Sequence, residues 1–509
     1  MLGYPATLGA FKRLTPSEVL AKAREVPEGA STAYPLVMDD IKVVSRGGVR
    51  NGTILFGFLP NVSMKSLKIS IEGAGQWDVR VPQTVYPPRE DTLMLCRVIA
   101  GLSTKCVGKA LEVGCGSGLV TMVLTSLGWE VTACDLNPYA VSSTRGNLDL
   151  NGLPGAEKIF ESGIGEGMQI PEDTQLIVWN LPYLDEGAEN RGLLEKVEEI
   201  ALNDISAGGW GGSLLRQLEN ENSSLCDKVA VILVMRTDPE GNSRISDWEH
   251  GGWSWRALES ERYGPEKVEV IGFWRTGSGV EATIVESCSS TMDEAVKLDK
   301  EGWQRIFSKI QTNGRGRRGS EWISEEGGVF ATWNLDSGVL ETLSPGLIQT
   351  SVGAVISEIL SADMKWPNDI IKEDGQKIGG VLLESTNGGP IRVGVGVNKH
   401  SFEKDGVCGY GWEETVGGRD ASEIFTEIDR ALSSIFEDNG VFVGTKPESL
   451  VRSSWRALSR SLSRGVTASL GEDLLRPSGL NIRGELEVVD RRETGVIRDL
   501  DNVGWVFPN

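Results

Sequence analysis

A short run in the middle of the chain combines glycine and arginine in a way that suits anion binding. Gly314–Gly319 reads Gly-Arg-Gly-Arg-Arg-Gly. Glycines supply mobility and backbone N–H donors, and guanidinium groups donate in a planar fork that matches carboxylate and phosphate oxygens. The run could instead bind RNA or be a solvated surface loop, but those interpretations need repetition or a basic surround, and the sequence has neither. It therefore predicts a loop that becomes ordered over an anionic ligand.

A second set of residues has the spacing of a cofactor site. Gly114, Gly116 and Gly118 join a predicted strand to a predicted helix, where the missing Cβ atoms let a ligand approach the backbone. Asp135 ends the next predicted strand, and a carboxylate there can accept hydrogen bonds from two ribose hydroxyls. These four residues alone also fit a dinucleotide binder or simple tight packing. The run Asn180–Tyr183, at the end of a later strand, makes the pattern more specific.

Composition limits the classes of function that these residues can serve. The chain has 509 residues and a formal charge of −21, which disfavours non-specific nucleic-acid binding. Seven cysteines without C-x-x-C spacing predict neither a zinc site nor a disulfide framework. The two histidines, His250 and His400, leave few candidates for histidine acid–base chemistry. No apolar stretch approaches a membrane span and no signal pattern opens the chain, so we expect a cytoplasmic protein without a membrane segment.

The elements that must position these residues follow from the apolar periodicity. Strands alternate with helices between residues 110 and 183, which predicts a parallel, doubly wound sheet. The small, polar stretch 275–282 is a candidate linker. Strand-like runs and amphipathic helices follow it, and the last 45 or so residues alternate apolar and polar residues, which predicts a small closed β unit. Near the start, 18–26 predicts a short helix, while 54–59 and 67–73 predict strands.

Residues 84–275 resemble the HemK-like class I methyltransferases. The glycine turn and Asn-Leu-Pro-Tyr, where that family has Asn-Pro-Pro-Tyr, carry the resemblance. Segments 85–95 and 201–218 are similar to its release-factor glutamine methyltransferase branch. The resemblance implies S-adenosylmethionine as cofactor, with Asp91 and either Glu161 or Ser162 nearby. The residues implied to bind it are Thr92, Glu112, Gly114, Gly116, Gly118, Asp135 and Asn180.

The resemblance also implies how a methyl acceptor is held. An amide or aromatic amine nitrogen is a poor nucleophile, so its two N–H groups would be accepted by the Asn180 side chain and the Leu181 carbonyl. Pro182 and Tyr183 complete the acceptor-binding motif, with Tyr183 packing on the flat group. In the glutamine branch the substrate is the Gly-Gly-Gln tip of a release factor, and a small zinc-binding activator protein is often required. Two alternatives stay open, an amino-methyltransferase acting on nucleic acid and an inactive methyltransferase-fold scaffold.

Residues 282–509 resemble the biotin protein ligase family. Five motifs occur in that family's order, at 287–295, 314–322, 364–369, 377–385 and 393–398. The resemblance implies biotin and ATP as substrates, with Mg²⁺ on the phosphates, and no Walker A motif offers another way to hold ATP. Arg315, Arg317 and Lys365 would be the catalytic cations. The residues implied to bind biotin or the adenylate are Ser290, Thr291, Met292, Gln311, Gly314, Gly316, Trp322, Gly379, Gly380 and Asn398.

Two positions depart from the ligase family's pattern. Met292 and Ser320 stand where the family often has asparagine and arginine, respectively. Neither change removes a charge that we assign to the reaction, although Met292 could alter hydrogen bonding to biotin slightly.

The expected architecture is an α/β Rossmann-like methyltransferase domain followed by an α+β ligase catalytic domain and a small C-terminal β-barrel. The expected bounds are 1–80 for an N-terminal segment of unassigned role, 81–277 and 281–460 for the two catalytic domains, and 461–509 for the barrel. The ligase would biotinylate a lysine of a biotin carboxyl carrier protein. No winged-helix module is recognisable, so we expect no DNA-binding module. Ligases of the family commonly form homodimers, but the sequence leaves the oligomeric state open.

Overall fold

The computed structural model describes residues 64–509, apart from 104–106, 183–207, 221–224, 226, 300, 386–389, 405, 491–492, 499–502 and 508–509. Before residue 64 it describes only the paired strands β1 (Val44–Ser45) and β2 (Gly48–Val49). The chain divides into two units, residues 1–64 and residues 65–509. The helix predicted at 18–26 and the strand predicted at 54–59 lie outside the described residues.

The first half of the larger unit is built on a seven-stranded sheet in the order β10-β11-β9-β8-β5-β6-β7. Its first five strands in chain order pair in parallel and the last two are antiparallel, as the predicted doubly wound fold requires in its main part. The central strands are buried along most of their length because helices cover both of their faces. The strands are β5 (Lys109–Val113), β6 (Glu130–Asp135), β7 (Ile159–Glu161), β8 (Thr174–Asn180), β9 (Ala230–Asp238), β10 (Trp253–Tyr263) and β11 (Glu266–Arg275).

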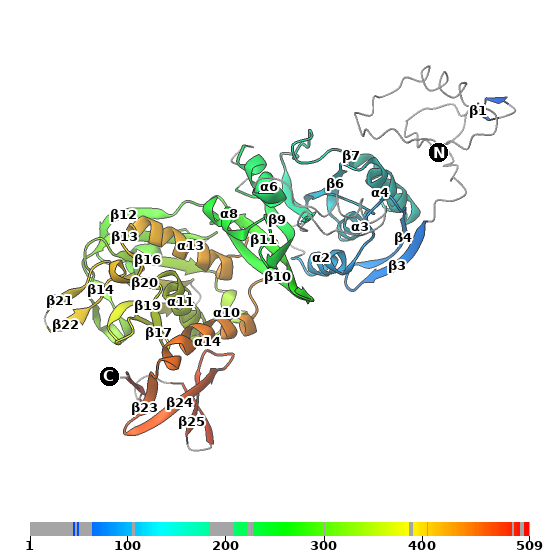
Figure 1. The fold of residues 1–509 in the computed structure, drawn as a ribbon. Helices are drawn as coiled ribbons and strands as arrows, with labels where there is room; N and C mark the ends of the chain where they lie inside the picture. The colour runs from blue at the N-terminus through cyan, green and yellow to red at the C-terminus, as the bar shows by residue number, and fades with distance from the viewer. Residues whose placement is uncertain are drawn as a thin grey trace, which may run out of the picture. The chain divides into compact units, whose positions relative to one another are not determined.

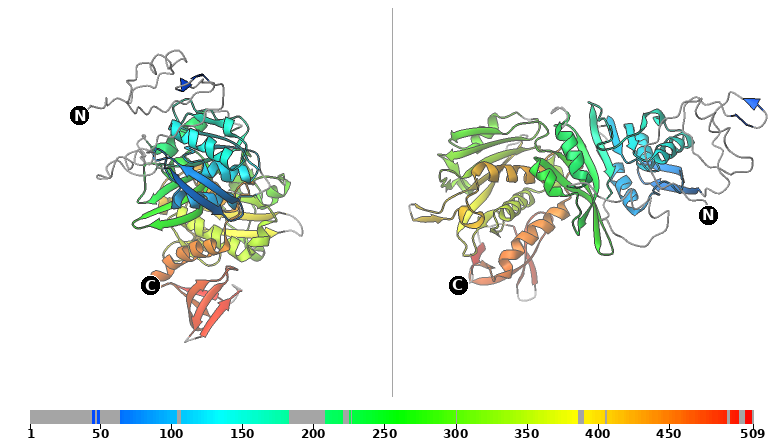
Figure 2. Two further views of the ribbon diagram at one scale, coloured as in Figure 1. Left: turned by 90° about the vertical axis from the view of Figure 1, so that its right-hand side faces the viewer. Right: turned by 45° about the horizontal axis from the view of Figure 1, so that its top comes forward.

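Two hydrophobic clusters lie on the two faces of this sheet. One contains residues of α2, α3 and α4, and the other contains residues of α6 and α8 (Figures 1 and 2). The antiparallel hairpin β3 (Lys65–Ile71) and β4 (Gly75–Val81) adds its buried Trp77 and Val79 to the first cluster. Residues 65–80, expected in the N-terminal segment, thus share a core with this domain. The helices are α2 (Glu90–Ala100), α3 (Leu119–Ser126), α4 (Pro138–Leu150), α6 (Gly209–Asn220) and α8 (Ile245–His250), with the 3-10 turn η1 (Ala156–Lys158).

The second half contains another seven-stranded sheet, in the order β12-β13-β16-β20-β19-β18-β17. Its pairings are antiparallel except for the β12–β13 pair. This is the α+β arrangement that the sequence predicted. The strands are β12 (Thr283–Cys288), β13 (Gln304–Gln311), β16 (Val329–Leu335), β17 (Asp363–Lys365), β18 (Asp369–Ile371), β19 (Lys377–Ser385) and β20 (Ile391–Val397), with small hairpins β14 (Gly314–Arg315)–β15 (Glu321–Trp322) and β21 (Phe402–Lys404)–β22 (Val407–Gly409).

One hydrophobic core joins this sheet to helices α11 and α13. Helix α11 (Pro345–Ile359) begins with Ser344 as N-cap and proline at N1, and α13 (Ala421–Phe436) begins with an Asp420–Glu423 capping box. Both starts satisfy backbone N–H groups that would otherwise lack partners. The remaining helices are α9 (Thr291–Glu294), α10 (Val339–Thr342), α12 (Glu413–Val416) and α14 (Pro447–Ser463), with the 3-10 turns η2 (Ala295–Lys297) and η3 (Arg317–Gly319).

The C-terminal segment forms a five-stranded antiparallel sheet, but the predicted closed barrel is not confirmed. Among the described residues the order is β26-β25-β24-β23-β27, with β26 and β27 at opposite ends. Trp366 from the ligase-like half and Leu458 of α14 pack against the sheet, so a neighbouring domain buries its apolar side in place of closure. The strands are β23 (Thr467–Leu470), β24 (Asp473–Leu480), β25 (Leu486–Asp490), β26 (Glu493–Ile497) and β27 (Val503–Val506).

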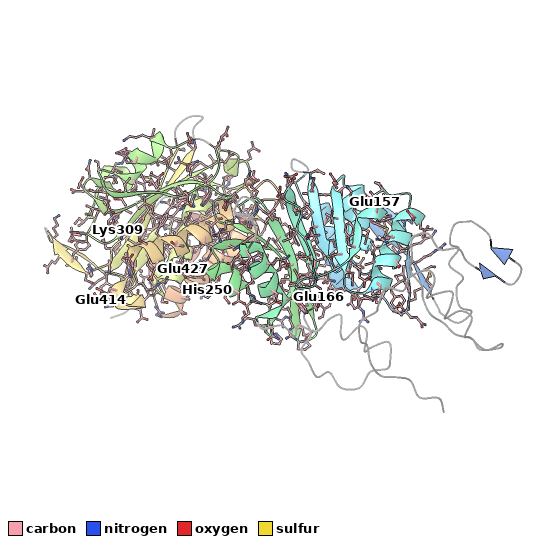
Figure 3. The ribbon with its side chains drawn as sticks, turned by 90° about the horizontal axis from the view of Figure 1, so that it is seen from above. Glu157, Glu166, His250, Lys309, Glu414 and Glu427 are labelled. Carbon is pink, nitrogen blue, oxygen red and sulfur yellow. The ribbon has the colours of Figure 1, made fainter. Side chains whose placement is uncertain are left out.

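Neither histidine is placed for acid–base chemistry in a buried site. His250 is exposed at the end of α8 (Figure 3). The exposed His400 pairs with Glu413 through a 2.7 Å contact from Nδ1. In the part of the chain that the structure describes, no helix is both long and apolar enough to span a membrane.

Candidate active sites

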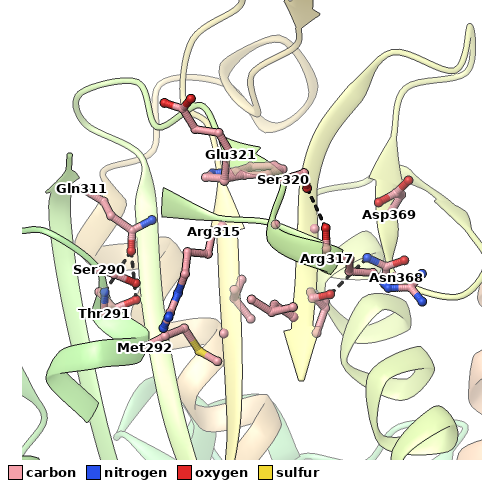
Figure 4. A pocket seen from close by; sticks show the side chains of 18 of the residues that line it. Ser290, Thr291, Met292, Gln311, Arg315, Arg317, Ser320, Glu321, Asn368 and Asp369 are labelled. Atoms are coloured by element: carbon pink, nitrogen blue, oxygen red, sulfur yellow. Dashed lines mark hydrogen bonds between the residues drawn. The ribbon is translucent and has the colours of Figure 1, made fainter. Parts of the chain in front are cut away.

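A cavity of about 270 Å³ opens on the ligase-like half, beneath the arginine–glycine run (Figure 4). Its lining is mostly polar and includes both positively and negatively charged side chains. Nine of the thirteen residues expected at this site line it, namely Ser290, Thr291, Met292, Gln311, Arg315, Gly316, Arg317, Trp322 and Gly380. Gly314, Lys365, Gly379 and Asn398 are not among its lining residues.

The arginine–glycine run folds back as a tight hairpin at the cavity. Gly314 pairs with Trp322 and Arg315 with Glu321, and η3 forms the turn between them. A Cβ at Gly314 would lie 2.8 Å from the Trp322 carbonyl oxygen, which explains why glycine is needed at that position. Gly319 has φ +76° and supplies the left-handed residue of the turn. The run therefore has a defined covering geometry over the cavity.

One wall of the cavity is a small hydrogen-bonded cluster. Gln311 accepts from the Thr291 backbone N–H at 2.9 Å and donates to the Ser324 hydroxyl at 3.3 Å. Thr332 donates to the Thr291 hydroxyl at 3.0 Å. Ser290 is 1% exposed, and its hydroxyl has no hydrogen-bond partner among the described residues. A buried hydroxyl without a partner is costly, so Ser290 points to a polar ligand group at this wall.

Arg315 reaches from β14 toward the Thr291–Met292 turn (Figure 4). Its Nη2 lies 2.8 Å from Asp293 Oδ1 and 3.7 Å from Glu384 Oε2. The Arg315 and Asp293 side chains are 38% and 53% exposed, so such a pair contributes only about 0–1 kcal/mol. The guanidinium can therefore exchange these carboxylates for the oxygens of a ligand at little cost.

The cavity floor is made of glycines that admit large side chains close to the sheet. At Gly396 a Cβ would lie 2.8 Å from Trp322 Nε1, and at Gly394 it would lie 2.6 Å from Met292 Sδ. Trp322 Nε1 is buried and has no partner among the described residues. Met292 is 4% exposed and packs at the position where the ligase family often has asparagine. The floor thus combines apolar packing with one unsatisfied indole donor.

Sequence reasoning did not single out three charged residues of the cavity, Glu321, Asp369 and Lys377. Asp369 Oδ1 lies 2.7 Å from Lys377 Nζ, and its Oδ2 lies 3.1 Å from Lys365 Nζ. Burial opposes ionisation of Asp369, but Lys377 and then Lys365 outweigh it and hold the pKa of this carboxyl below its ordinary value. Lys377 lines the cavity and Lys365 does not. All three missed residues lie inside motifs of the sequence, at 314–322, 364–369 and 377–385.

The other expected residues support the site from behind. Asn398 accepts from the Glu325 backbone N–H at 3.2 Å and donates to the Ile323 carbonyl at 3.3 Å, which fixes the chain that follows Trp322. A Cβ at Gly379 would lie 2.9 Å from the Gly396 carbonyl oxygen. These residues shape the walls without lining the cavity.

The second candidate site lies at the carboxyl ends of β5, β6 and β8. Gly114, Gly116 and Gly118 have φ values of +69°, +53° and +82°, which only glycine adopts readily. A Cβ at Gly118 would lie 2.9 Å from the Thr144 Cα atom, whereas the nearest atom to a Cβ at Gly116 would be 3.9 Å away. Gly118 is therefore needed for helix packing, and Gly116 leaves open space for a ligand.

The two acidic residues of this turn have different environments. Asp135 accepts from the Gly116 backbone N–H at 2.9 Å and from the Asn137 backbone N–H at 2.8 Å. Each carboxylate oxygen keeps a second lone pair for a hydroxyl. Burial raises the pKa of Asp135, while these backbone N–H groups oppose the rise. Glu112 is 4% exposed, accepts from the Thr121 hydroxyl, and has its pKa raised to about 8, chiefly by burial.

Asn180 ends β8 with its side chain oriented by the first turn of α2. Its Nδ2 donates to Asp91 Oδ2 and to Thr92 Oγ1, both at 3.3 Å. Asp91 also accepts from the Thr92 backbone N–H at 2.6 Å. Asn180 Oδ1 is buried and has no partner among the described residues. This orientation leaves an acceptor for an external N–H group.

The rest of the acceptor motif is only partly described. Leu181 is 1% exposed and packs in a hydrophobic cluster with residues of α6. Pro182 is half-buried, and Tyr183 lies outside the described residues. Ser162 donates its backbone N–H to the Asp135 carbonyl at 3.2 Å, and Glu161 is exposed. Among the described residues no group of three or more His, Cys, Asp or Glu side chains could hold a metal ion.

Two family models match the chain, one in each half. Residues 94–212 match the methyltransferase small domain, and residues 285–398 match the biotin/lipoate A/B protein ligase family. The first match contains Asn180 and the glycine turn. The second contains every residue expected at the ligase-like site. The two regions do not overlap, so each half of the chain is similar to a different family.

Individual relatives agree with this division. The chain is 25% identical over 224 residues to the bifunctional ligase/repressor BirA of Escherichia coli, a match that covers 40% of this chain and 66% of the relative. It is 26% identical over 209 residues to a putative protein N5-glutamine methyltransferase of Methanocaldococcus jannaschii, which covers 41% of this chain and 98% of the relative. A structure of the Aquifex aeolicus biotin protein ligase with biotin and ATP matches with 20% identity and a TM-score of 0.34, over 45% of this chain and 99% of that one.

Proposed function

Because its halves carry a methyltransferase region and a biotin/lipoate protein ligase region, we propose that the chain is a two-enzyme fusion. The second half activates biotin with ATP and transfers it to a lysine of a biotin carboxyl carrier domain. The first half methylates a side-chain amide nitrogen with S-adenosylmethionine, and its acceptor is the glutamine of a release factor. The observation that carries the ligase proposal is the cavity that Arg315 and Arg317 of the hairpin line together with Lys377.

The ligase chemistry needs positive charge where the biotin carboxylate meets the ATP phosphates. A biotin carboxylate oxygen attacks the α-phosphorus of ATP, the bond to the bridging oxygen breaks, and pyrophosphate leaves with its electron pair. The two reactants repel each other, so fixed cations that face the developing charge lower the barrier. Arg315, Arg317 and Lys377 supply these cations. The lysine amine of the carrier then attacks the biotinyl carbonyl, AMP leaves, and the amine loses a proton.

Biotin and Mg²⁺ have distinct supports in this site. The unpartnered Ser290 hydroxyl faces the polar end of the vitamin, and the glycine floor with Trp322 and Met292 packs against its apolar part. Mg²⁺ neutralises phosphate charge when it is bound with ATP. Asp369 and Glu321 are the cavity carboxylates that could hold it. A site with few protein ligands suits an ion carried mainly by substrate phosphates.

The methyltransferase proposal is supported by the orientation of Asn180. S-adenosylmethionine supplies a methyl group activated by the sulfonium charge, and the open space at Gly116 with the Asp135 carboxylate suits its ribose. Asp91 and Thr92 bind the Asn180 amino group, so the amide oxygen is left to accept an N–H of the acceptor. A planar amide held this way keeps its nitrogen aligned without a general base. In the glutamine branch a small zinc-binding activator would assist.

The ligase is tested by incubating the full chain with ATP, Mg²⁺, biotin and a carrier domain, and reading the mass of the acceptor. We expect one biotinyl addition, with a loss of about 100-fold in rate for Arg315→Ala. Arg452→Ala is the matched control, because Arg452 is an exposed arginine on α14 that donates to Ser449. Absence of biotin-dependent pyrophosphate exchange, together with salt-sensitive RNA retention, would favour an RNA-binding protein instead.

The methyltransferase is tested separately. The full chain is mixed with radiolabelled S-adenosylmethionine and either a release factor or a structured RNA, and label transfer is compared with that of Asn180→Ala. Label on the release-factor glutamine supports the proposal, and label on RNA favours the nucleic-acid alternative. No cofactor binding at high micromolar concentration would identify the first half as a scaffold.

A further inference from the structure

One side of helix α13 packs against the ligase sheet, and the other side contacts the methyltransferase hairpin β10–β11 (Figures 1 and 2). Toward the ligase it presents Asp429, whose carboxylate accepts from Trp303 and Trp333 Nε1 at 2.8 Å each and from Arg305 Nε at 2.9 Å. These partners lie on or beside β13 and β16, the strands that carry Gln311 and Thr332 of the ligase site. The helix therefore braces the sheet that supports the cavity.

The opposite side of α13 leads to a second buried carboxylate, Glu437. It is 4% exposed and accepts from Trp274 Nε1 of β11 at 3.0 Å. It also accepts from the Gly277 backbone N–H at 3.1 Å and from the Ser278 hydroxyl at 2.8 Å. The stretch 275–282, a candidate linker by its composition, is thus bound to a carboxylate about 160 residues away along the chain. If the halves separated, Glu437 would lose these three partners.

Arg256 of β10 makes the matching contact from the methyltransferase side. It is 7% exposed and donates to the backbone carbonyls of Ser434 at 2.9 Å and Val443 at 2.7 Å. Its guanidinium also lies over the Trp274 ring, 5.1 Å from the centroid. These acceptors belong to the ligase half, so separation of the halves would remove them from the guanidinium.

The segment after α13 completes the contact with apolar side chains. Val441 and Phe442 belong to the hydrophobic cluster of the methyltransferase half, although they follow the ligase helix in sequence. Phe442 lies 5.6 Å from Trp274 between ring centroids, and a Cβ at Gly272 would meet its ring at 2.7 Å. Val441 also accepts a backbone hydrogen bond from Ser103 at 3.0 Å. Domains that only touch keep separate cores, whereas here one chain segment completes the core of the other domain.

We propose that the methyltransferase half is a structural part of the ligase, so that residues 65–509 unfold as one cooperative unit. The apolar anchor Phe442, the buried Glu437 and the buried Arg256 each have partners across the contact between the halves. A ligand that binds either half then stabilises both, because it binds only the folded state of the shared unit. The proposal requires neither half to be catalytically active.

Calorimetry of the full chain tests this directly, first without ligand. We expect one unfolding transition for residues 65–509, and we expect biotin with a non-hydrolysable ATP analogue to raise its midpoint as a whole. S-adenosylhomocysteine should raise the same transition. Two transitions in the ligand-free chain, each shifted by only one of these ligands, would overturn the proposal. The number of transitions without ligand tests the proposal even if one of the ligands does not bind.

A mild variant separates true coupling from coincident melting. Trp274→Phe keeps an aromatic ring, although a smaller one, and removes the donor to Glu437. We expect it to lower the midpoint by about 2 °C or more and to broaden or split the transition. Thr426→Ala is the control, since Thr426 is an exposed residue of α13 whose hydroxyl donates to the Ser422 carbonyl of its own helix. Amide exchange of α13 and β11 should accelerate together in Trp274→Phe. An unchanged midpoint with unchanged exchange would count against the shared unit.

Discussion

Lys377 Nζ lies 2.7 Å from Asp369 Oδ1, and that carboxylate also holds Lys365 at 3.1 Å. The two lysines therefore compete for one counter-charge, but only Lys377 faces the cavity. Lys377 Nζ also lies over the Trp322 ring, 5.1 Å from its centroid. A cation at that position can reach a phosphate group, whereas Lys365 supports it from behind.

This arrangement predicts different effects for the two lysines. Lys377→Met should lower the rate of biotin-dependent pyrophosphate exchange by about 100-fold, because a cation facing the reacting phosphate is lost. Lys365→Met should lower it by less than about tenfold, because Asp369 keeps its partner in the cavity. Equal losses in the two variants, or the reverse order, would return the catalytic role to Lys365.

Asp369, the carboxylate between the two lysines, should affect the reaction by positioning them. Asp369→Asn leaves two ammonium groups close together without their counter-charge, so we expect Lys377 to move out of position and pyrophosphate exchange to fall by about tenfold. The KM for ATP should rise in the same variant, because the cation no longer points at the phosphates. The exposed Asp374, which pairs only with Lys372 among the described residues, gives the control Asp374→Asn. A variant with unchanged KM and reduced kcat would instead indicate a direct role in the chemical step.

Much of the ligase-like site could be predicted because its motifs are contiguous. A run such as Ser290–Met292 or Arg315–Arg317 occupies one turn or one hairpin, so its members lie together whatever the rest of the fold. Lys365 and Lys377 lie in separate strands, and which of them faces the cavity depends on the pairing registers of β17 with β18 and of β18 with β19. A one-residue change of register reverses the faces of a strand, and no local pattern fixes it.

Long-range contacts explain the other differences from the sequence-based expectations. Stretch 275–282 has the composition of a linker, but its partner Glu437 is remote in sequence. The alternation of apolar and polar residues in the last 45 or so residues correctly predicts strands. Whether their sheet closes into a barrel depends on which edge strands pair with each other. Trp366 supplies an outside apolar partner for that sheet, through packing and a 2.8 Å hydrogen bond to the Gly484 carbonyl.

Loss of the hairpin arginine should affect retention of the activated vitamin. Arg317 lines the cavity from the turn of the hairpin, where it can cover a bound adenylate. We expect Arg317→Gly to form biotinyl-AMP but to release it at least about tenfold faster, because the covering loop loses a contact with the phosphate. Release is measured by rapid filtration after a single turnover. Retention equal to that of the parent would show that the hairpin does not hold the intermediate.

The buried Glu112 predicts a pH dependence of stability. Its pKa is raised from 4.5 to about 8 in the folded chain, so the folded state keeps a proton that the unfolded state has lost. The free energy of unfolding should therefore fall as pH rises from about 5 to 8, and this contribution should level off above pH 8. Glu112→Gln removes it, so the difference between parent and variant should grow over the same range. Denaturant unfolding at several pH values measures it, and a difference independent of pH would show that Glu112 ionises normally.

The last prediction concerns the methyl acceptor. Asn180 Oδ1 is the buried acceptor that the Asp91–Thr92 pair leaves unused, so replacing it should weaken methyl transfer more than cofactor binding. We expect Asn180→Ala to lower kcat for methylation by about 100-fold, while the Kd for S-adenosylhomocysteine changes by less than about threefold. Asp135→Ala should show the opposite pattern, because its carboxylate faces the ribose position.

Two measurements distinguish these outcomes from general damage to the domain. Thermal unfolding of Asn180→Ala checks that the fold survives, since the change also removes hydrogen bonds to Asp91 and Thr92. Titration with S-adenosylhomocysteine gives the Kd. If Asn180→Ala loses cofactor affinity to the same extent as catalysis, the Asn180 amide serves the cofactor pocket, and a group other than Asn180 must hold the methyl acceptor.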